Sequence, residues 1–168
     1  MDVLVRGGTV VDGTGSPARI ADVAIGEGVI TDVGALDGVT AETVIDATGR
    51  LVTPGFIDVH SHSDAYILLE PSAASKVAQG VTTEIVGNCG ACAAPRTDRA
   101  RMPSDWAAQS YPRRWHSVAE YRTLLEEAQP AINIGLLAGH NTLRASAMGY
   151  EPRPATDEEL ARMRALLE

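Results

Sequence analysis

The stretch Leu51–Asp64, LVTPGFIDVHSHSD, constrains the fold more than any other part of the sequence. A proline–glycine turn leads into a short apolar segment, and two histidines, His60 and His62, follow one residue apart. Alternate side chains of a β-strand share a face, so a strand here points Asp58, His60 and His62 in one direction. Neutral imidazole is the commonest protein ligand for zinc, and an aspartate beside it can fix its tautomer. The pattern indicates a metal site, the alternative being a core strand whose histidines pack or face solvent.

The only two cysteines, Cys89 and Cys92, form a C-x-x-C pair after the β-rich segment 81–86. In a reducing compartment this spacing favours metal or redox chemistry over a structural disulfide. Three alternatives stay open, namely a zinc ligand, a thioredoxin-like redox pair and an inert buried thiol. We interpret Cys92 as a packing residue.

Three motifs occur in order along the chain: PGFIDVHSH, then KVAQGVTTEIVGNCGACAAP over 76–95, then LLAGHNTLR over 136–144. The first resembles the first barrel-strand motif of the amidohydrolase superfamily of metal-dependent hydrolases. The second resembles the N-acyl-D-amino-acid deacylases, or D-aminoacylases, and the third resembles the end of that family's third strand. The resemblance covers essentially the whole chain. It implies zinc-dependent hydrolysis of the amide of N-acyl-D-amino acids to a carboxylate and a D-amino acid, on a (β/α)8 barrel.

The same resemblance implies a set of metal ligands. Cys89 would hold the tightly bound zinc with histidines of later strands, and His60 and His62 would belong to a second, weaker or vestigial metal position. The later ligands and the family's catalytic aspartate are expected beyond Glu168. No catalytic residue is therefore identifiable in these 168 residues, and we expect them to be inactive by themselves.

Other polar residues near these motifs have two interpretations each. Asp64 either orients His62 or caps the next segment, and Asn88 either donates to a ligand or forms a turn. His140 either contacts substrate or ligands or is a hydrogen-bonded structural residue. Arg144 either pairs with a substrate carboxylate or is a solvated helix residue, and His116 is expected at the surface.

Charge and hydropathy argue against two classes of partner, and the resemblance implies a small-molecule N-acyl amino acid as the substrate. The chain has 14 basic and 22 acidic residues and a formal charge of −8, which argues against nucleic acid and anionic membranes. No apolar run approaches the ~20 residues of a membrane span. The N-terminus MDVLVRGG has no signal-peptide pattern, so we expect a cytoplasmic protein.

The order of elements predicts an α/β protein with two domains. Short strands over 1–53 predict the N-terminal part of a small β-sandwich. Residues 54–168 predict three or so βα units, which the resemblance implies are the first units of a TIM barrel. A complete barrel takes about 250 residues, so we expect the front part of a longer enzyme. The open edge of such a partial sheet predicts self-association of the chain.

The sequence also predicts individual elements. The expected strands and helices are a strand pair over 2–12 turned at Gly7-Gly8, a hairpin over 22–33, a strand pair over 43–53, a helix over 70–79, strands over 81–86 and 130–138, a helix over 117–128 and a last helix after Thr156. Capping boxes begin the last two helices, and residues 96–115 are expected to form a long excursion.

Two other functions are considered. Cyclic-amide hydrolases of the dihydroorotase or hydantoinase type share the PGFIDVHSH resemblance but not the GNCG cysteine. A non-catalytic folding or assembly module would need no zinc, so metal content distinguishes it from an enzyme.

Overall fold

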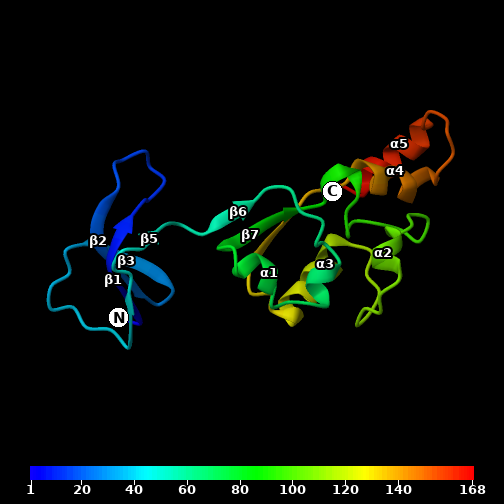
Figure 1. Cartoon of the computed structure of the whole chain (residues 1–168). Coiled ribbons are helices and arrows are strands. Elements are labelled where there is room, and N and C mark those ends of the chain that lie inside the picture. Colours follow the sequence, from blue (N-terminus) through cyan, green and yellow to red (C-terminus); the bar gives the residue numbers. More distant parts are fainter. The chain divides into compact units, whose positions relative to one another are not determined.

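The structure is a computed structural model that describes all 168 residues and divides them into two compact units, Met1–Pro54 and Gly55–Glu168 (Figure 1). The first unit is built of strands and the second of strands and helices. The fold class is therefore α/β, as the sequence predicts.

The first unit is one five-stranded sheet. Its strands are β1 (Val3–Val10), β2 (Arg19–Gly26), β3 (Val29–Gly34), β4 (Thr43–Asp46) and β5 (Leu51–Val52). The order is β3-β2-β1-β4, with β5 also beside β1. The antiparallel β2–β3 hairpin confirms the expected turn near Gly28. The proposed sandwich stays a prediction, because residues 1–54 supply a single sheet.

The expected strand pair over 2–12 is wrong. The chain forms one strand, β1, with a bulge between Val5 and Gly8 in its pairing with β2. The amide of Gly7 donates to Asp22 Oδ1 at 2.8 Å, and a Cβ on Gly8 would lie 2.4 Å from the side chain of Val52. The two glycines thus allow a bulge and close packing of the Val52 side chain against β1, and they do not form a reverse turn.

The segment 43–53 forms two strands, but they do not pair with each other. Both β4 and β5 pair with β1 in parallel. The turn between them is held by Asp46, whose Oδ1 accepts from the amide of Thr48 at 2.9 Å. This turn carries the chain along β1 instead of reversing it.

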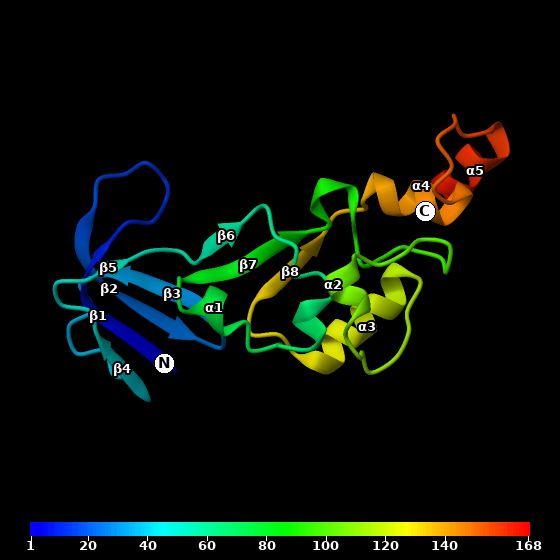
Figure 2. The same cartoon turned by 45° about the vertical axis from the view of Figure 1, so that its right-hand side comes forward.

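The second unit contains a parallel three-stranded sheet in the order β6-β7-β8. The strands are β6 (Phe56–Asp58), β7 (Val81–Val86) and β8 (Asn133–Leu136). The structure confirms the predicted strand over 81–86, whereas the predicted strand over 130–138 is shorter than expected. In Figure 2 the arrowheads of β7 and β8 point to the same end of the sheet, where α4 begins.

Helices lie around this sheet (Figure 2). They are η1 (Tyr66–Leu68), α1 (Ala74–Val77), η2 (Asn88–Gly90), α2 (Ser104–Ala107), α3 (Val118–Ala128), α4 (His140–Met148) and α5 (Asp157–Ala165). The predicted capping boxes of α3, at Ser117 and Glu120, and of α5, at Thr156 and Glu159, are confirmed. The helix predicted over 70–79 is reduced to α1, because Ala73 adopts a left-handed conformation with φ 44°.

The core of the second unit fixes the segments that lead to and from the candidate site. Its buried members include Trp115, Tyr121 and Leu124, packed with Ala93 and Ala94. Trp115 Nε1 donates to the carbonyl of Ala93 at 2.8 Å. The predicted excursion over 96–115 contains one short helix, α2. None of the helices combines the length and the apolar character needed to cross a lipid bilayer.

Candidate metal centre

The two histidines follow β6 in a bend and are not part of the strand. The strand ends at Asp58, yet the amide of Ser61 still donates to Ile85 O at 3.1 Å and keeps the bend beside β7. His60 and His62 are both exposed, with ring centroids 5.5 Å apart and ring planes at 62°. The histidines therefore converge through a bend, and strand alternation does not account for their placement.

Cys89 lies in a tight loop, η2, directly after β7. Gly87, Cys89 and Gly90 have φ values of 85°, 55° and 81°. A Cβ on Gly87 would lie 2.1 Å from Leu137 O, and one on Gly139 would lie 2.4 Å from Gly90 O. The missing side chains let the loop lie directly against the chain that leaves β8, and this contact holds Cys89 in its left-handed conformation.

His60, His62 and Cys89 form one cluster. His60 Nε2 is 3.3 Å from Cys89 Sγ, and one donor atom from each of the three lies within 4.8 Å of the others. Around a tetrahedral zinc ion with ordinary bond lengths, sulfur and nitrogen ligands are about 3.6 Å apart. The spacing and the mixed sulfur and nitrogen donors therefore fit a zinc ion.

Asn88 braces the two loops of the cluster. Its Nδ2 donates to Ile85 O at 2.8 Å and to Ser61 O at 3.3 Å. From α4, Asn141 Nδ2 donates to the carbonyl of Cys89 at 3.4 Å. Asn88 thus joins the Cys89 loop to the histidine bend through backbone oxygens and does not donate to a histidine ring or the thiol.

Asp58 was expected to contact an imidazole ring, but its carboxylate has other partners. Its Oδ1 accepts from the backbone amide of His60 at 3.1 Å, and its Oδ2 is 2.7 Å from Lys76 Nζ. The hydrogen bond from Lys76, followed by that from His60, lowers the pKa of Asp58. Asp58 consequently holds the start of the bend as a carboxylate.

Lys76 and Glu84 are site residues that the sequence reasoning missed. Lys76 Nζ lies 2.6 Å from Glu84 Oε1, and the Glu84 side chain is fully buried. The hydroxyl of Ser63, beyond His62, donates to the other Glu84 oxygen. Hydrogen bonds to Asp58 and then to Glu84 raise the pKa of Lys76. A signal was present, because Lys76 is the only lysine and Glu84 interrupts a β-rich run.

Asp64 lies below the bend and is fully buried. Neither carboxylate oxygen makes a hydrogen bond of ordinary geometry, although nearby backbone amides of Ala93 and Gly87 partly stabilise its charge. Burial is the main cause that raises its pKa to about 6. Tyr121 Oη donates to the backbone carbonyl of Asp64 at 2.5 Å, which fixes the segment after His62.

The remaining candidates lie outside the cluster. Cys92 is buried and unpaired, and burial raises the pKa of its thiol, in keeping with a packing residue. His140 is exposed in the first turn of α4. Arg144 Nη2 donates to Glu151 O at 2.9 Å and to Arg153 O at 2.7 Å, so it holds the α4–α5 connection. His116 is exposed, as expected.

The sequence matches the model of the amidohydrolase family over residues 43–168. The chain belongs to the amidohydrolase family. A D-aminoacylase from Alcaligenes xylosoxydans xylosoxydans is 40% identical over 168 residues, which cover 99% of this chain and 35% of that protein.

Solved structures agree with this assignment. A D-aminoacylase studied for its binuclear metal centre, with one-metal activation and second-metal attenuation, superposes with a TM-score of 0.89 at 40% identity, over 98% of this chain and 35% of that one. An N-acyl-D-glutamate deacylase from Bordetella bronchiseptica, complexed with zinc and a phosphonate inhibitor, gives 0.88 at 37% identity, over 99% and 35%. This amidohydrolase chain spans about a third of the length of the relatives it matches.

Proposed function

We propose that this chain supplies zinc ligands to an amidohydrolase that hydrolyses N-acyl-D-amino acids to a carboxylate and a D-amino acid. The observation that carries the proposal is the convergence of His60, His62 and Cys89 from two loops within 4.8 Å. The similar proteins described above, a D-aminoacylase and an N-acyl-D-glutamate deacylase, support the substrate class.

The residues of this chain hold the metal position from two sides. Cys89 supplies sulfur from the loop after β7, and His60 and His62 supply nitrogen from the bend after β6. Zinc at this position supplies Lewis-acid chemistry for amide hydrolysis. The brace by Asn88 and the ion-paired Asp58 keep the two loops in place, so the donor atoms need little rearrangement on binding.

We further propose that 54–168 forms the first βα units of a (β/α)8 barrel and 1–53 part of a small β-sandwich. The parallel order β6-β7-β8 supports the first assignment. The cluster follows the carboxyl ends of β6 and β7, where barrel enzymes have their active sites.

The alternative functions are less well supported. Cys89 lies within hydrogen-bond distance of His60, and a thiolate donor of this kind distinguishes the deacylases from the hydantoinase and dihydroorotase type. A non-catalytic folding or assembly module would not require three exposed donor side chains to converge.

Zinc content per chain tests the metal site. We expect about one zinc per parent chain by elemental analysis after dialysis, and a loss of most of it in Cys89→Ala and in His60→Ala. Cys92→Ala is the matched control, because it removes the other thiol while leaving the cluster intact, and it should retain zinc. Equal retention in Cys89→Ala and the parent would contradict the proposed site.

The substrate class is tested separately, on the full-length natural protein. Acyl release from N-acetyl-D-amino acids, including the aspartate and glutamate derivatives, is compared with release from the L-enantiomers. We expect release from the D-enantiomers only. Zinc binding without such release would leave the metal site standing and reject the deacylase.

Two further proposals concern the state of the chain. We propose self-association through the edge strand β6, because Phe56 and Ile57 in this strand and Val59 just after it expose 57, 62 and 68% of their surface. Light scattering that shows only monomers would reject it.

We also propose a cytoplasmic location for the protein, where Cys89 and Cys92, both unpaired, would stay reduced.

A further inference from the structure

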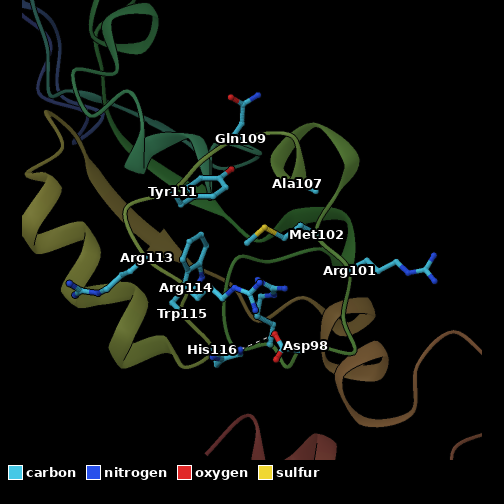
Figure 3. Close-up of a pocket in the computed structure, with 11 residues that line it drawn as sticks. Asp98, Arg101, Met102, Ala107, Gln109, Tyr111, Arg113, Arg114, Trp115 and His116 are labelled. Atoms are coloured by element: carbon cyan, nitrogen blue, oxygen red, sulfur yellow. Dashed lines mark hydrogen bonds and ion pairs between the residues drawn. The ribbon is translucent and has the colours of Figure 1, made fainter.

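A cavity in the Gly55–Glu168 unit is lined entirely by the excursion between the Cys89 loop and α3. It has a volume of about 940 Å³ and is lined by residues of the segment 96–116 (Figure 3). Organic ligands of proteins commonly occupy pockets of roughly 300–1,000 Å³. None of the candidate metal ligands lines it.

The lining carries an excess of positive charge. Four arginines and one aspartate line the cavity, in a chain whose formal charge is −8. The aspartate, Asp98, is engaged by His116 at 3.1 Å, and Arg113 pairs with Glu127 at 3.0 Å. Arg96, Arg101 and Arg114 form no ion pair with a carboxylate. The guanidinium group of Arg101 lies over the ring of Tyr150, 5.5 Å from its centroid, so those of Arg96 and Arg114 are available to an anion.

Arg96 and Arg114 are the central pair. Arg96 is half-buried, and its guanidinium group makes one hydrogen bond, from Nη2 to Ala100 O at 3.2 Å. Burial is the main cause that lowers the pKa of Arg96. The charge of Asp98 opposes this shift, and the charge of Arg114 adds to it. Figure 3 shows Arg114 beside the Asp98–His116 pair, whereas the side chains of Arg101 and Arg113 extend to opposite sides. Asp98 is the only carboxylate that lines the cavity, so the four guanidinium groups leave an excess of positive charge that favours an anion.

One wall of the cavity is apolar and rigid. Tyr111 and Trp115 meet edge to face with ring centroids 5.2 Å apart, and Met102 also lines the space. Trp115 is fixed by its hydrogen bond to the carbonyl of Ala93. A ligand can thus contact guanidinium groups and an aromatic surface at once.

We propose that this cavity binds a small organic anion that carries two carboxylates or a phosphate next to an apolar group. Guanidinium groups bind carboxylate and phosphate oxygens in pairs, which gives both affinity and orientation. The apolar part lies against Tyr111 and Met102, and the charged part lies between Arg96 and Arg114. The site is separate from the proposed metal centre and depends on different side chains.

Phthalate and phenyl phosphate are suitable probes, because both carry a benzene ring and differ in the charged group. The chain has two tryptophans, and only Trp115 lines the cavity, so the indole N–H signal of Trp115 in 15N-labelled protein reports binding. We expect a saturable shift of the Trp115 signal with a Kd below about 1 mM at low salt. A preference for phthalate assigns the site to dicarboxylates, and the reverse preference assigns it to phosphates.

The variants Arg114→Gln and Arg96→Gln should each weaken binding about tenfold, equivalent to about 1.4 kcal/mol. Arg114→Lys keeps the charge but loses the planar fork, so its affinity should lie between those of the parent and Arg114→Gln. Arg122→Gln is the matched control, because Arg122 is 78% exposed on α3 and pairs with Glu126 away from the cavity. It should change the Kd by less than about twofold.

Three results would overturn the proposal. They are the lack of a saturable shift with either probe, equal weakening by Arg122→Gln and Arg114→Gln, and an equal shift with neutral benzyl alcohol. The last two would mean that general charge or the ring alone accounts for the signal.

Discussion

The ammonium group of Lys76 lies 2.6 Å from a carboxylate oxygen of Glu84, whose side chain is fully buried. The same ammonium group lies 2.7 Å from Asp58, which in turn accepts from the amide of His60. One cation therefore joins α1, β7 and the end of β6 below the proposed ligands. Its removal affects both the fold and the metal site.

Replacement of Lys76 by Met should destabilise the chain by about 3 kcal/mol, because it leaves the Glu84 carboxylate buried without a partner. The midpoint of urea unfolding at neutral pH measures the change. We expect zinc retention to fall as well, since Asp58 loses the cation that positions it against His60.

The double variant Lys76→Met, Glu84→Gln separates these effects. It removes the buried charge as well as the cation, so most of the lost stability should return while zinc retention stays low. A double variant as unstable as Lys76→Met would show that the ion pair is not the cause.

Asp64 should make the metal-free chain less stable as the pH rises. Burial raises its folded-state pKa to about 6, above an ordinary value of 3.8. Below about pH 4 the carboxyl is protonated in both the folded and the unfolded chain, so its burial carries no penalty from a charge and does not lower the free energy of unfolding. Between pH 4 and 6 the unfolded chain loses the proton first, so stability falls, by at most roughly 3 kcal/mol.

Urea unfolding of the parent and of Asp64→Asn, both in the presence of a chelator, checks this prediction between pH 4 and 7. The parent should lose stability relative to the variant over that range. A difference that is constant with pH would show that Asp64 has an ordinary pKa.

Substitution of Gly87 by Ala should abolish zinc retention and lower stability, because the new methyl group would meet Leu137 O at 2.1 Å. Gly80→Ala is a matched control with a similar φ of 79°, where the nearest atom belongs to Phe56 at 3.4 Å. The control should lower the free energy of unfolding only by the strain of a left-handed alanine, about 1 kcal/mol, and it should retain zinc. Equal zinc content in the two variants would contradict the close-approach argument.

The capping box of α3 gives a purely structural prediction. Ser117→Ala removes the hydroxyl that accepts from the amide of Glu120 at 3.1 Å, and should cost about 1 kcal/mol in thermal or urea unfolding. Ser104→Ala is the control, since Ser104 is exposed and caps no helix. Zinc retention should be unchanged in both variants.

Local patterns in the sequence predicted the features that depend on local chemistry. The capping boxes of α3 and α5 and the strand 81–86 follow from a few adjacent residues, and the structure confirms them. The ordered motifs predicted the family and the α/β class. The close approach of His60, His62 and Cys89 agrees with the metal site that the motifs indicated, whose metal content stays a prediction.

Features that depend on distant residues were not predictable in the same way. Asp58 was expected to contact an imidazole ring, but Lys76, which is 18 residues away, draws its carboxylate into an ion pair. The glycine pair in β1 was expected to form a turn, but the strand continues through a bulge, and the side chain of Val52 lies against Gly8. The cavity of the excursion depends on how a segment without periodicity folds back on Trp115, which no local pattern encodes.

The single lysine has a consequence for chemical modification of the surface. Thirteen of the fourteen basic side chains are arginines, which keep their charge at all physiological pH values and are not targets of acetylation. The one side-chain amine is ion-paired with Asp58 and Glu84 and is therefore a poor nucleophile. The charge pattern of these 168 residues is therefore largely insensitive to acylation of lysine side chains.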